Sequence, residues 1–74
     1  MQREAIELKV WRKGDPDPLT KGLTQLDGYL DRLHLNTGTL IIFDRRPNAA
    51  PITERTRFDQ TTSPTGRPIT ILRA

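Results

Sequence analysis

The chain of 74 residues contains no cysteine and only one histidine. No disulfide can therefore cross-link the fold, and one imidazole is too few for a protein zinc site. A single domain of this length buries only ~60% of the surface that its unfolded chain exposes. Small domains without disulfides or structural metals usually rely on very regular packing or on a partner chain. The sequence therefore predicts one domain, residues 1–74, in a homo-oligomer or with a partner that completes its sheet.

Long apolar runs are also missing. The longest, Leu40 to Phe43, is far shorter than the ~20 residues with which a helix spans a bilayer. The N-terminus has no apolar signal region either. We therefore expect a soluble chain that is not exported and has no membrane partner. The lack of cysteine is compatible with a reducing cytoplasm, which is the location we expect.

The net charge of +3 is distributed unevenly. Residues 1–44 contain six Lys or Arg and seven Asp or Glu, a balance of −1, whereas residues 45–74 contain six and two, a balance of +4. A basic segment can bind phosphates, so nucleic acid is one candidate partner. A modest surplus of arginine is also common on a solvated surface, and both interpretations stay open.

The stretch EAIELKVW, residues 4–11, has the alternation of a strand, which we expect at residues 3–11. Side chains two apart on a strand share a face, so Glu7 and Lys9 project together. The apolar residues Ile6, Leu8 and Val10 pack on the other side. Because an isolated charge is costly in apolar surroundings, Glu7 and Lys9 indicate either a functional site or an ion pair.

A leucine stripe predicts one amphipathic helix at residues 19–35. Pro18 and the residues just after it suit the first turn, and Thr20 is a candidate N-cap if the helix begins a little later. Asn36 to Gly38 supply the stop. Gly22 and Gly28 each disfavour a helix, so we expect close packing against a neighbour there. The leucines recur at steps of four and three residues: Leu19, Leu23, Leu26, Leu30 and Leu33.

The segment TLIIFD, residues 39–44, has the continuous apolar pattern of a strand covered on both faces. Strand, helix and strand make a βαβ unit with parallel strands, and residues 53–73 read as a C-terminal β-hairpin with a turn at Ser63 to Gly66. The expected class is α/β, with the helix on one face of a small mixed sheet. Nothing in the chain covers the other face, so we expect a second copy or another protein there.

Glu7 and Lys9 on a strand, followed by Gln25 and Tyr29 on a helix, resemble the E-x-K and Q-x-x-x-Y motifs of the PD-(D/E)xK nuclease superfamily, in its RecB-like branch. The likeness continues through GLTQLDGYLDRL, TGTLIIFDRR and GRPITILRA. These runs resemble the C-terminal end of bacterial proteins that join an ATPase module to such a nuclease-like domain. The resemblance spans nearly the whole chain and implies a truncated restriction-endonuclease-like core.

The resemblance also implies roles for individual residues. Glu7 and the main-chain carbonyl of Leu8 would be ligands of Mg²⁺ or Mn²⁺, and Lys9 would orient or activate the attacking water. Such hard cations prefer oxygen ligands, and a bound metal can activate water beside a phosphate. Gln25 and Tyr29 would orient the site or contact nucleic acid.

Three further side chains are candidates for nucleic-acid contacts. Arg45 and Arg46 follow the buried strand and suit phosphate contacts, although solvated arginines are common after a strand. Trp11 would share the face of Glu7 and Lys9 if the strand extends so far. It could stack on a base, but packing at a sheet edge or in a dimer contact is the more frequent role of such a residue.

The chain departs from the superfamily at one position. The superfamily carries its Asp on a strand before E-x-K, and only six residues precede Glu7. Glu4 points to the opposite face, and Asp44 has no counterpart in the superfamily. One carboxylate and one carbonyl make a weak magnesium site.

Two functions therefore stay open. The first is a remnant or C-terminal part of a metal-dependent nuclease-like domain that acts on nucleic-acid phosphodiesters and is inactive or weak alone. The second is a non-catalytic module for oligomerisation or nucleic-acid binding. In the second case the pair formed by Glu7 and Lys9 is an ordinary ion pair on a half-exposed strand, worth little to stability.

Overall fold

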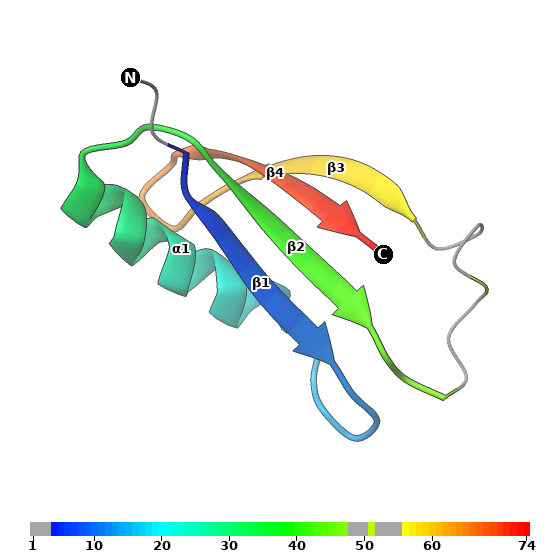
Figure 1. Ribbon diagram of the computed structural model, residues 1–74. Coiled ribbons are helices and arrows are strands. Elements are labelled where there is room, and N and C mark those ends of the chain that lie inside the picture. The colour runs from blue at the N-terminus through cyan, green and yellow to red at the C-terminus, as the bar shows by residue number, and fades with distance from the viewer. Residues whose placement is uncertain (1–3, 48–50, 52–55) are drawn as a thin grey trace.

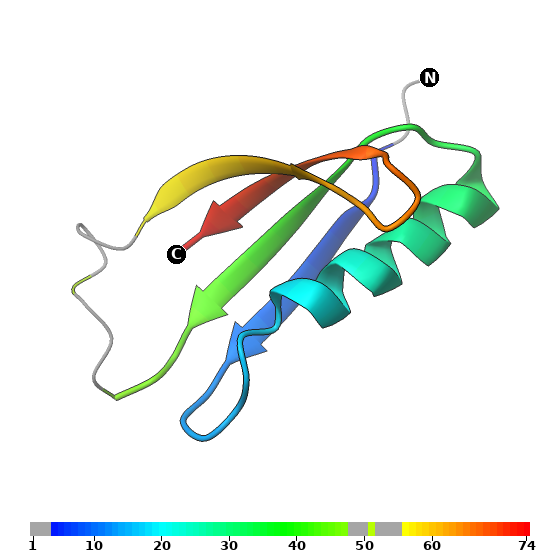
Figure 2. The same ribbon diagram turned by 180° about the vertical axis from the view of Figure 1, so that it is seen from behind.

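The computed structural model describes residues 4–47, 51 and 56–74. In chain order its elements are β1 (Ile6–Trp11), α1 (Leu19–Leu33), β2 (Gly38–Asp44), β3 (Arg57–Thr62) and β4 (Pro68–Arg73). The strands form one sheet in the order β1-β2-β4-β3, and α1 lies across one face of it (Figures 1 and 2). No helix in the described part of the chain is long and apolar enough to cross a membrane. The predicted α/β class, with one helix on a small mixed sheet, is confirmed.

The strand directions agree with the predicted topology. β1 and β2 are parallel neighbours joined through α1, and β3 and β4 form an antiparallel hairpin. β4 joins the sheet beside β2, to which it is parallel. The predicted hairpin at residues 53–73 contains both of these strands, and its first residues, 53–55, lie outside the described residues. Residue 3 of the predicted first strand also lies outside them, and the helix is two residues shorter than predicted.

The helix begins two residues earlier than an N-cap at Thr20 requires. Leu19 is its first residue, and its N–H donates to Asp17 Oδ1 at 3.0 Å. Thr20 already lies inside the helix, where its carbonyl oxygen accepts from Thr24 Oγ1 at 3.0 Å. The prediction of Thr20 as the cap is therefore wrong, because the carboxylate of Asp17 supplies the acceptor from the preceding loop.

The helix ends at a different residue from the predicted stop. His34 is the C-cap, with a left-handed φ of 56°. The Leu35 N–H donates to the Leu30 carbonyl at 2.9 Å and so caps the last turn. Gly38, which was expected to stop the helix, is instead the first residue of β2.

The core lies between α1 and the helix side of β2 and β4. Its leucines on α1 are Leu26 and Leu30, both fully buried. The strand residues packed beneath them share one face by alternation: Leu40, Ile42, Ile69 and Ile71. Ala5, which precedes β1, completes this cluster.

Gly22 allows α1 to approach the sheet closely, as predicted. A Cβ atom there would lie 2.8 Å from Leu40 Cδ1 and 3.4 Å from Lys9 Cγ. The same prediction for Gly28 is wrong, because a Cβ there would meet only Arg32 Nη2, at 4.0 Å. The helix is therefore tightest over β1 and β2 near its first turn.

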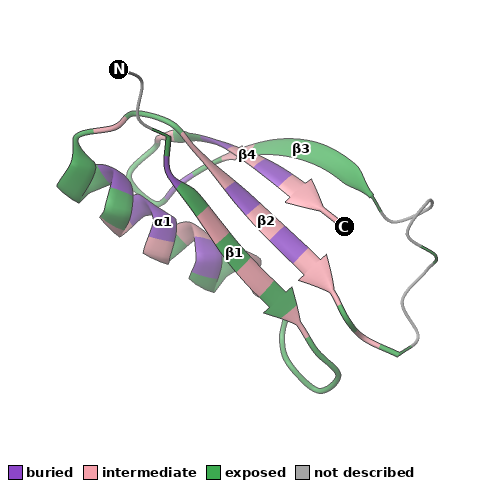
Figure 3. Ribbon diagram, viewed as in Figure 1, coloured by how far each residue is buried: buried purple, intermediate pink, exposed green. Residues whose placement is uncertain are grey.

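The other face of the sheet has no covering layer among the described residues. Ile6, Leu8 and Val10 point away from α1, opposite to Glu7 and Lys9 as predicted. They are exposed and do not pack, with Leu8 57% exposed. Figure 3 shows the resulting alternation of exposed and partly buried residues along β1. Here the side of β1 that carries the charges is the covered side.

Candidate functional site

Glu7 and Lys9 lie on β1 beneath the helix. Their partners in the register with β2 are Leu40 and Ile42, which are buried under α1. Lys9 Nζ is 3.6 Å from Glu7 Oε1, and the two side chains are only 20% and 14% exposed. They form an ion pair that the helix largely shields from water.

Gln25 and Tyr29 lie on the flank of α1 that faces β1. Asp27 marks the other flank of the helix, because it contacts the turn between β3 and β4. Since each residue of a helix is rotated by ~100° from the one before, Gln25 and Tyr29 lie roughly 160–200° around the helix axis from Asp27. Gln25 is half-buried and Tyr29 is exposed. No hydrogen bond among the described residues joins either side chain to Glu7 or Lys9. The structure thus places all four on one side of the sheet without direct bonds between the two pairs.

The predicted metal ligands do not by themselves fit Mg²⁺ or Mn²⁺. Within residues 4–47, 51 and 56–74, no three His, Cys, Asp or Glu side chains are grouped so that they could hold a metal. Glu7 is paired with Lys9, so even this one carboxylate faces a cation. With the Leu8 carbonyl it would offer two protein ligands, whereas Mg²⁺ demands six oxygens in near-ideal geometry and keeps its waters unless carboxylates replace them.

Asp44 does not supply the second carboxylate. It pairs in register with Trp11, four residues beyond Leu40, the partner of Glu7. At ~3.3 Å per residue this separation is roughly 13 Å along the sheet. Its two carboxylate oxygens accept from Arg46, at 2.9 Å from Nε and 2.6 Å from Nη2. Asp44 therefore anchors the loop that follows β2.

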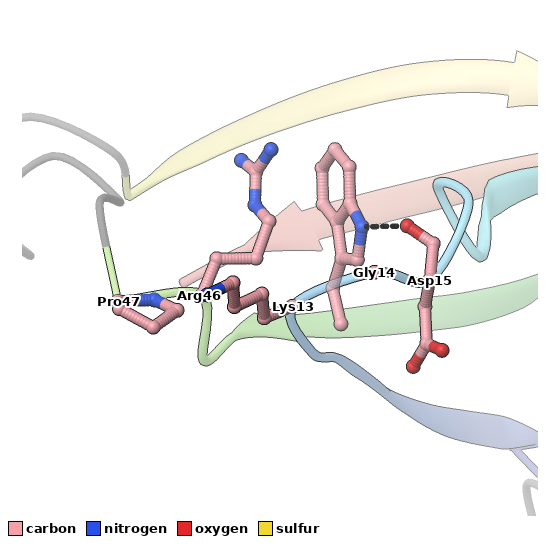
Figure 4. A pocket seen from close by; sticks show the side chains of 6 residues that line it. Lys13, Gly14, Asp15, Arg46 and Pro47 are labelled. Carbon is pink, nitrogen blue, oxygen red and sulfur yellow. Dashed lines mark hydrogen bonds between the residues drawn. The ribbon is translucent and has the colours of Figure 1, made fainter.

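Trp11 and Arg46 form a second cluster, at the carboxyl ends of β1 and β2. The Arg46 guanidinium carbon lies 3.5 Å from the centroid of the Trp11 ring. The hydrogen bonds to Asp44 hold the pKa of Arg46 above its usual value. Trp11 Nε1 donates to the Asp15 carbonyl oxygen at 2.9 Å (Figure 4). Trp11 lies on the face of Glu7 and Lys9, as predicted, and the cluster holds the loops after β1 and β2 together.

A hollow of about 510 Å³ opens beside this cluster. Exposed basic residues project from the same two loops: Arg12, Lys13 and Arg45. None of the three forms an ion pair with another residue in the described part of the chain. The hollow is lined by Trp11, Lys13, Gly14, Asp15, Arg46 and Pro47.

The charges at this end of the sheet sum to a positive balance. Arg12, Lys13, Arg45 and Arg46 contribute four positive charges and Asp15, Asp17 and Asp44 three negative ones, which leaves +1. The expectation of phosphate contacts from Arg45 and Arg46 did not include Arg12 and Lys13. The parallel pairing of β1 and β2 was the available signal, because it places both carboxyl ends at the same edge.

Asp27 accepts hydrogen bonds from three different side chains, and no role was predicted for it. It is 9% exposed. Its Oδ1 accepts from Ser63 Oγ and Thr65 Oγ1, both at 2.6 Å, and from Arg67 Nη1 at 2.8 Å. These bonds, first that from Ser63, hold the pKa of Asp27 below its usual value. Asp27 thereby attaches the turn between β3 and β4 to α1.

No family model matches the chain, and neither the curated proteins nor the solved structures contain a match. The resemblance to the nuclease superfamily therefore rests on the sequence motifs alone.

Proposed function

We propose that this chain is a PD-(D/E)xK nuclease-like domain with a restriction-endonuclease-like core, which binds nucleic acid but does not cut it unaided. The observation that carries the proposal is the placement of Glu7 and Lys9 side by side on a strand beneath a helix, 3.6 Å apart. Gln25 and Tyr29 lie on the flank of the same helix above that strand. The superfamily has these four residue types in this order on a strand and a helix.

Catalysis by the chain alone is not part of the proposal. Glu7 and one carbonyl make only a weak site for Mg²⁺ or Mn²⁺, because Mg²⁺ prefers octahedral oxygen coordination and surrenders its waters reluctantly. Metal binding would require a further carboxylate, which a partner chain could supply. Among the described residues, the ammonium group of Lys9 already neutralises the carboxylate of Glu7.

Nucleic-acid binding is supported by the basic loops after β1 and β2. Arg12, Lys13 and Arg45 are exposed and have no carboxylate partner among the described residues. Lysine and arginine that neutralise phosphates release condensed counterions, which gives affinity without sequence preference. The Trp11 ring and the Arg46 side chain stacked on it lie beside these loops. We propose that the backbone of a nucleic acid contacts this edge.

Two properties follow from the same features. The uncovered sheet face favours a partner chain, and we propose a homo-oligomer. The lack of cysteine suits a reducing compartment, and we propose the cytoplasm.

The test is to incubate the purified chain with labelled single- and double-stranded DNA in the presence of Mg²⁺ or Mn²⁺. We expect binding that weakens with salt and no cleavage. With three cations that have no carboxylate partner within residues 4–47, 51 and 56–74, the slope of log K against log salt should be about −2 to −3. Lys13→Ala and Arg45→Ala should each reduce this slope by about one.

The matched control is Arg32→Ala, which removes an exposed arginine in the last turn of α1. It should leave the slope unchanged. Binding that is insensitive to Lys13→Ala and Arg45→Ala would contradict the assigned edge. Cleavage that disappears in Glu7→Ala would show that the chain is active by itself, and cleavage that survives both Glu7→Ala and Lys9→Ala would remove the nuclease-like assignment of the pair.

A further inference from the structure

Among the residues that the structure describes, the uncovered face of the sheet carries no charged side chain. Its apolar members are Ile6, Leu8, Val10, Ile41, Phe43 and Phe58. Phe58 is 71% exposed and is the most exposed large apolar side chain described. Leu72 is a further apolar residue of this face. Uncharged threonine and glutamine side chains occupy the remaining central positions.

All the charges of the strands lie on the opposite side. The four strands contain six charged residues, and the alternation of side chains together with the strand register places every one of them on the helix side. These residues are Glu7, Lys9, Asp44, Arg57, Asp59 and Arg73. In a chain with 28% charged residues, this division leaves one face of the sheet neutral.

We propose that this neutral face packs against the same face of a second copy, with the two α1 helices on the outside. A two-fold interface brings a surface against its own copy, so a charge near the two-fold axis would meet the same charge of the partner. A neutral apolar face avoids this repulsion. The two sheets also have identical twist, which suits aligned face-to-face packing at a separation of ~10 Å.

The size of the face indicates a modest interface. Four strands ~4.8 Å apart, each with six residues at ~3.3 Å, span roughly 380 Å² of flat area. Projecting side chains raise the accessible area above this value. A standard interface buries about 800 Å² per partner, and the largest apolar patch on a monomer is typically about 300–600 Å². We therefore expect a dimer that forms and dissociates with concentration in the micromolar range.

The neutral face is the surface through which the homo-oligomer of the proposed function would form. Dimerisation through this face does not depend on nucleic-acid binding. Nucleic acid is not the expected occupant, because the face offers no cation to a phosphate. Arg12, Lys13 and Arg45, which have no ion-pair partner in the described part of the chain, follow β1 and β2 at one edge. Both activities can therefore be measured on one protein.

The experiment compares the sedimentation velocity of the wild type, Leu8→Lys and Leu33→Lys over a range of concentrations. Leu8 lies on the neutral face, whereas Leu33 is an exposed leucine at the end of α1. Circular dichroism checks that each variant is folded. The wild type should shift from monomer to dimer as concentration rises. Leu8→Lys, which places a charge in each half of the interface, should weaken dimerisation by at least about 100-fold, and Leu33→Lys should leave it unchanged.

A second variant, Phe58→Lys, tests the opposite edge of the face and should also weaken the dimer. A wild type that remains monomeric throughout overturns the inference, as does a dimer that Leu33→Lys disrupts and Leu8→Lys does not. Open-ended assembly in place of a dimer also overturns it. A monomeric Leu8→Lys that keeps the salt-dependent DNA binding of the wild type separates this inference from the nucleic-acid proposal.

Discussion

The two faces of the sheet divide the chain into a helix-covered side and a neutral side. The covered side combines a small apolar core with the ion pair of Glu7 and Lys9, whereas the other side exposes Leu8 and its neighbours. Burial stabilises through the area removed from water, and partly buried charges require partners. The comparison shows that the stability of the isolated chain comes from the covered face, and that the neutral face is available for association.

The largest expected difference between the faces comes from shortening one leucine on each. Leu40 is fully buried on the helix side, so Leu40→Ala should reduce the free energy of unfolding by about 3 kcal/mol. Leu8→Ala should cost less than about 1 kcal/mol in the monomer, because Leu8 is already 57% exposed. Urea denaturation at low protein concentration measures both. A domain of this size has only roughly 4–11 kcal/mol of stability, so Leu40→Ala should remove between about a quarter and three quarters of it.

Protein concentration separates the two faces further. If the neutral face forms the dimer, the wild type should become more stable as concentration rises, and Leu8→Ala should weaken this dependence. Leu40→Ala should destabilise the fold at every protein concentration. Equal effects of the two substitutions in the monomer would contradict the division of the sheet into a stabilising and an associating face.

The second largest effect concerns acid stability through Asp27, which belongs to the covered face. Its pKa is lowered in the folded protein by the hydrogen bonds from Ser63, Thr65 and Arg67. Its unfolded pKa is about 3.9. The carboxylate therefore contributes stability that is present above about pH 4 and is lost as the pH falls through the lower folded value. Thermal unfolding of the wild type from about pH 6 to about pH 2 should show this loss, and Asp27→Asn should show a smaller one.

Asp59→Asn is the matched control for this measurement. Asp59 is a half-exposed aspartate on β3 whose partner is Arg57, at 3.2 Å. Exposed pairs contribute little, so this variant should keep the pH dependence of the wild type. If Asp27→Asn lost as much stability at low pH as the wild type, the hydrogen bonds of Asp27 would not stabilise the fold.

Much of the fold could be predicted from local patterns in the sequence. The leucine stripe predicts α1, and the runs around Leu8 and Ile41 predict two strands, because each pattern has one period that suits one element. The parallel pairing follows from the helix between the strands. The hairpin was predicted, but which of its strands pairs with β2 could not be predicted. The order of strands in the sheet depends on contacts between distant segments of the chain.

The candidate site was less predictable, because alternation tells which residues share a face but not which face the helix covers. Glu7 and Lys9 were expected on one side of β1, and they are there, but only the tertiary fold shows that α1 shields them. The partners of Asp27 lie 36 to 40 residues away in the chain. Arg46 was expected to be available for phosphate, and the structure turns it onto Asp44 and Trp11.

The smallest expected effect is the coupling between Glu7 and Lys9. Their side chains are 3.6 Å apart and mostly shielded. Lys9→Met should cost up to about 1 kcal/mol, because it leaves the Glu7 carboxylate without its partner beneath the helix. Adding Glu7→Gln should restore most of the loss, because the double variant has no buried charge. Urea denaturation of the four proteins in a double-mutant cycle measures this coupling. Additive effects would show that the two charges are not energetically paired, so that each is free to engage a ligand.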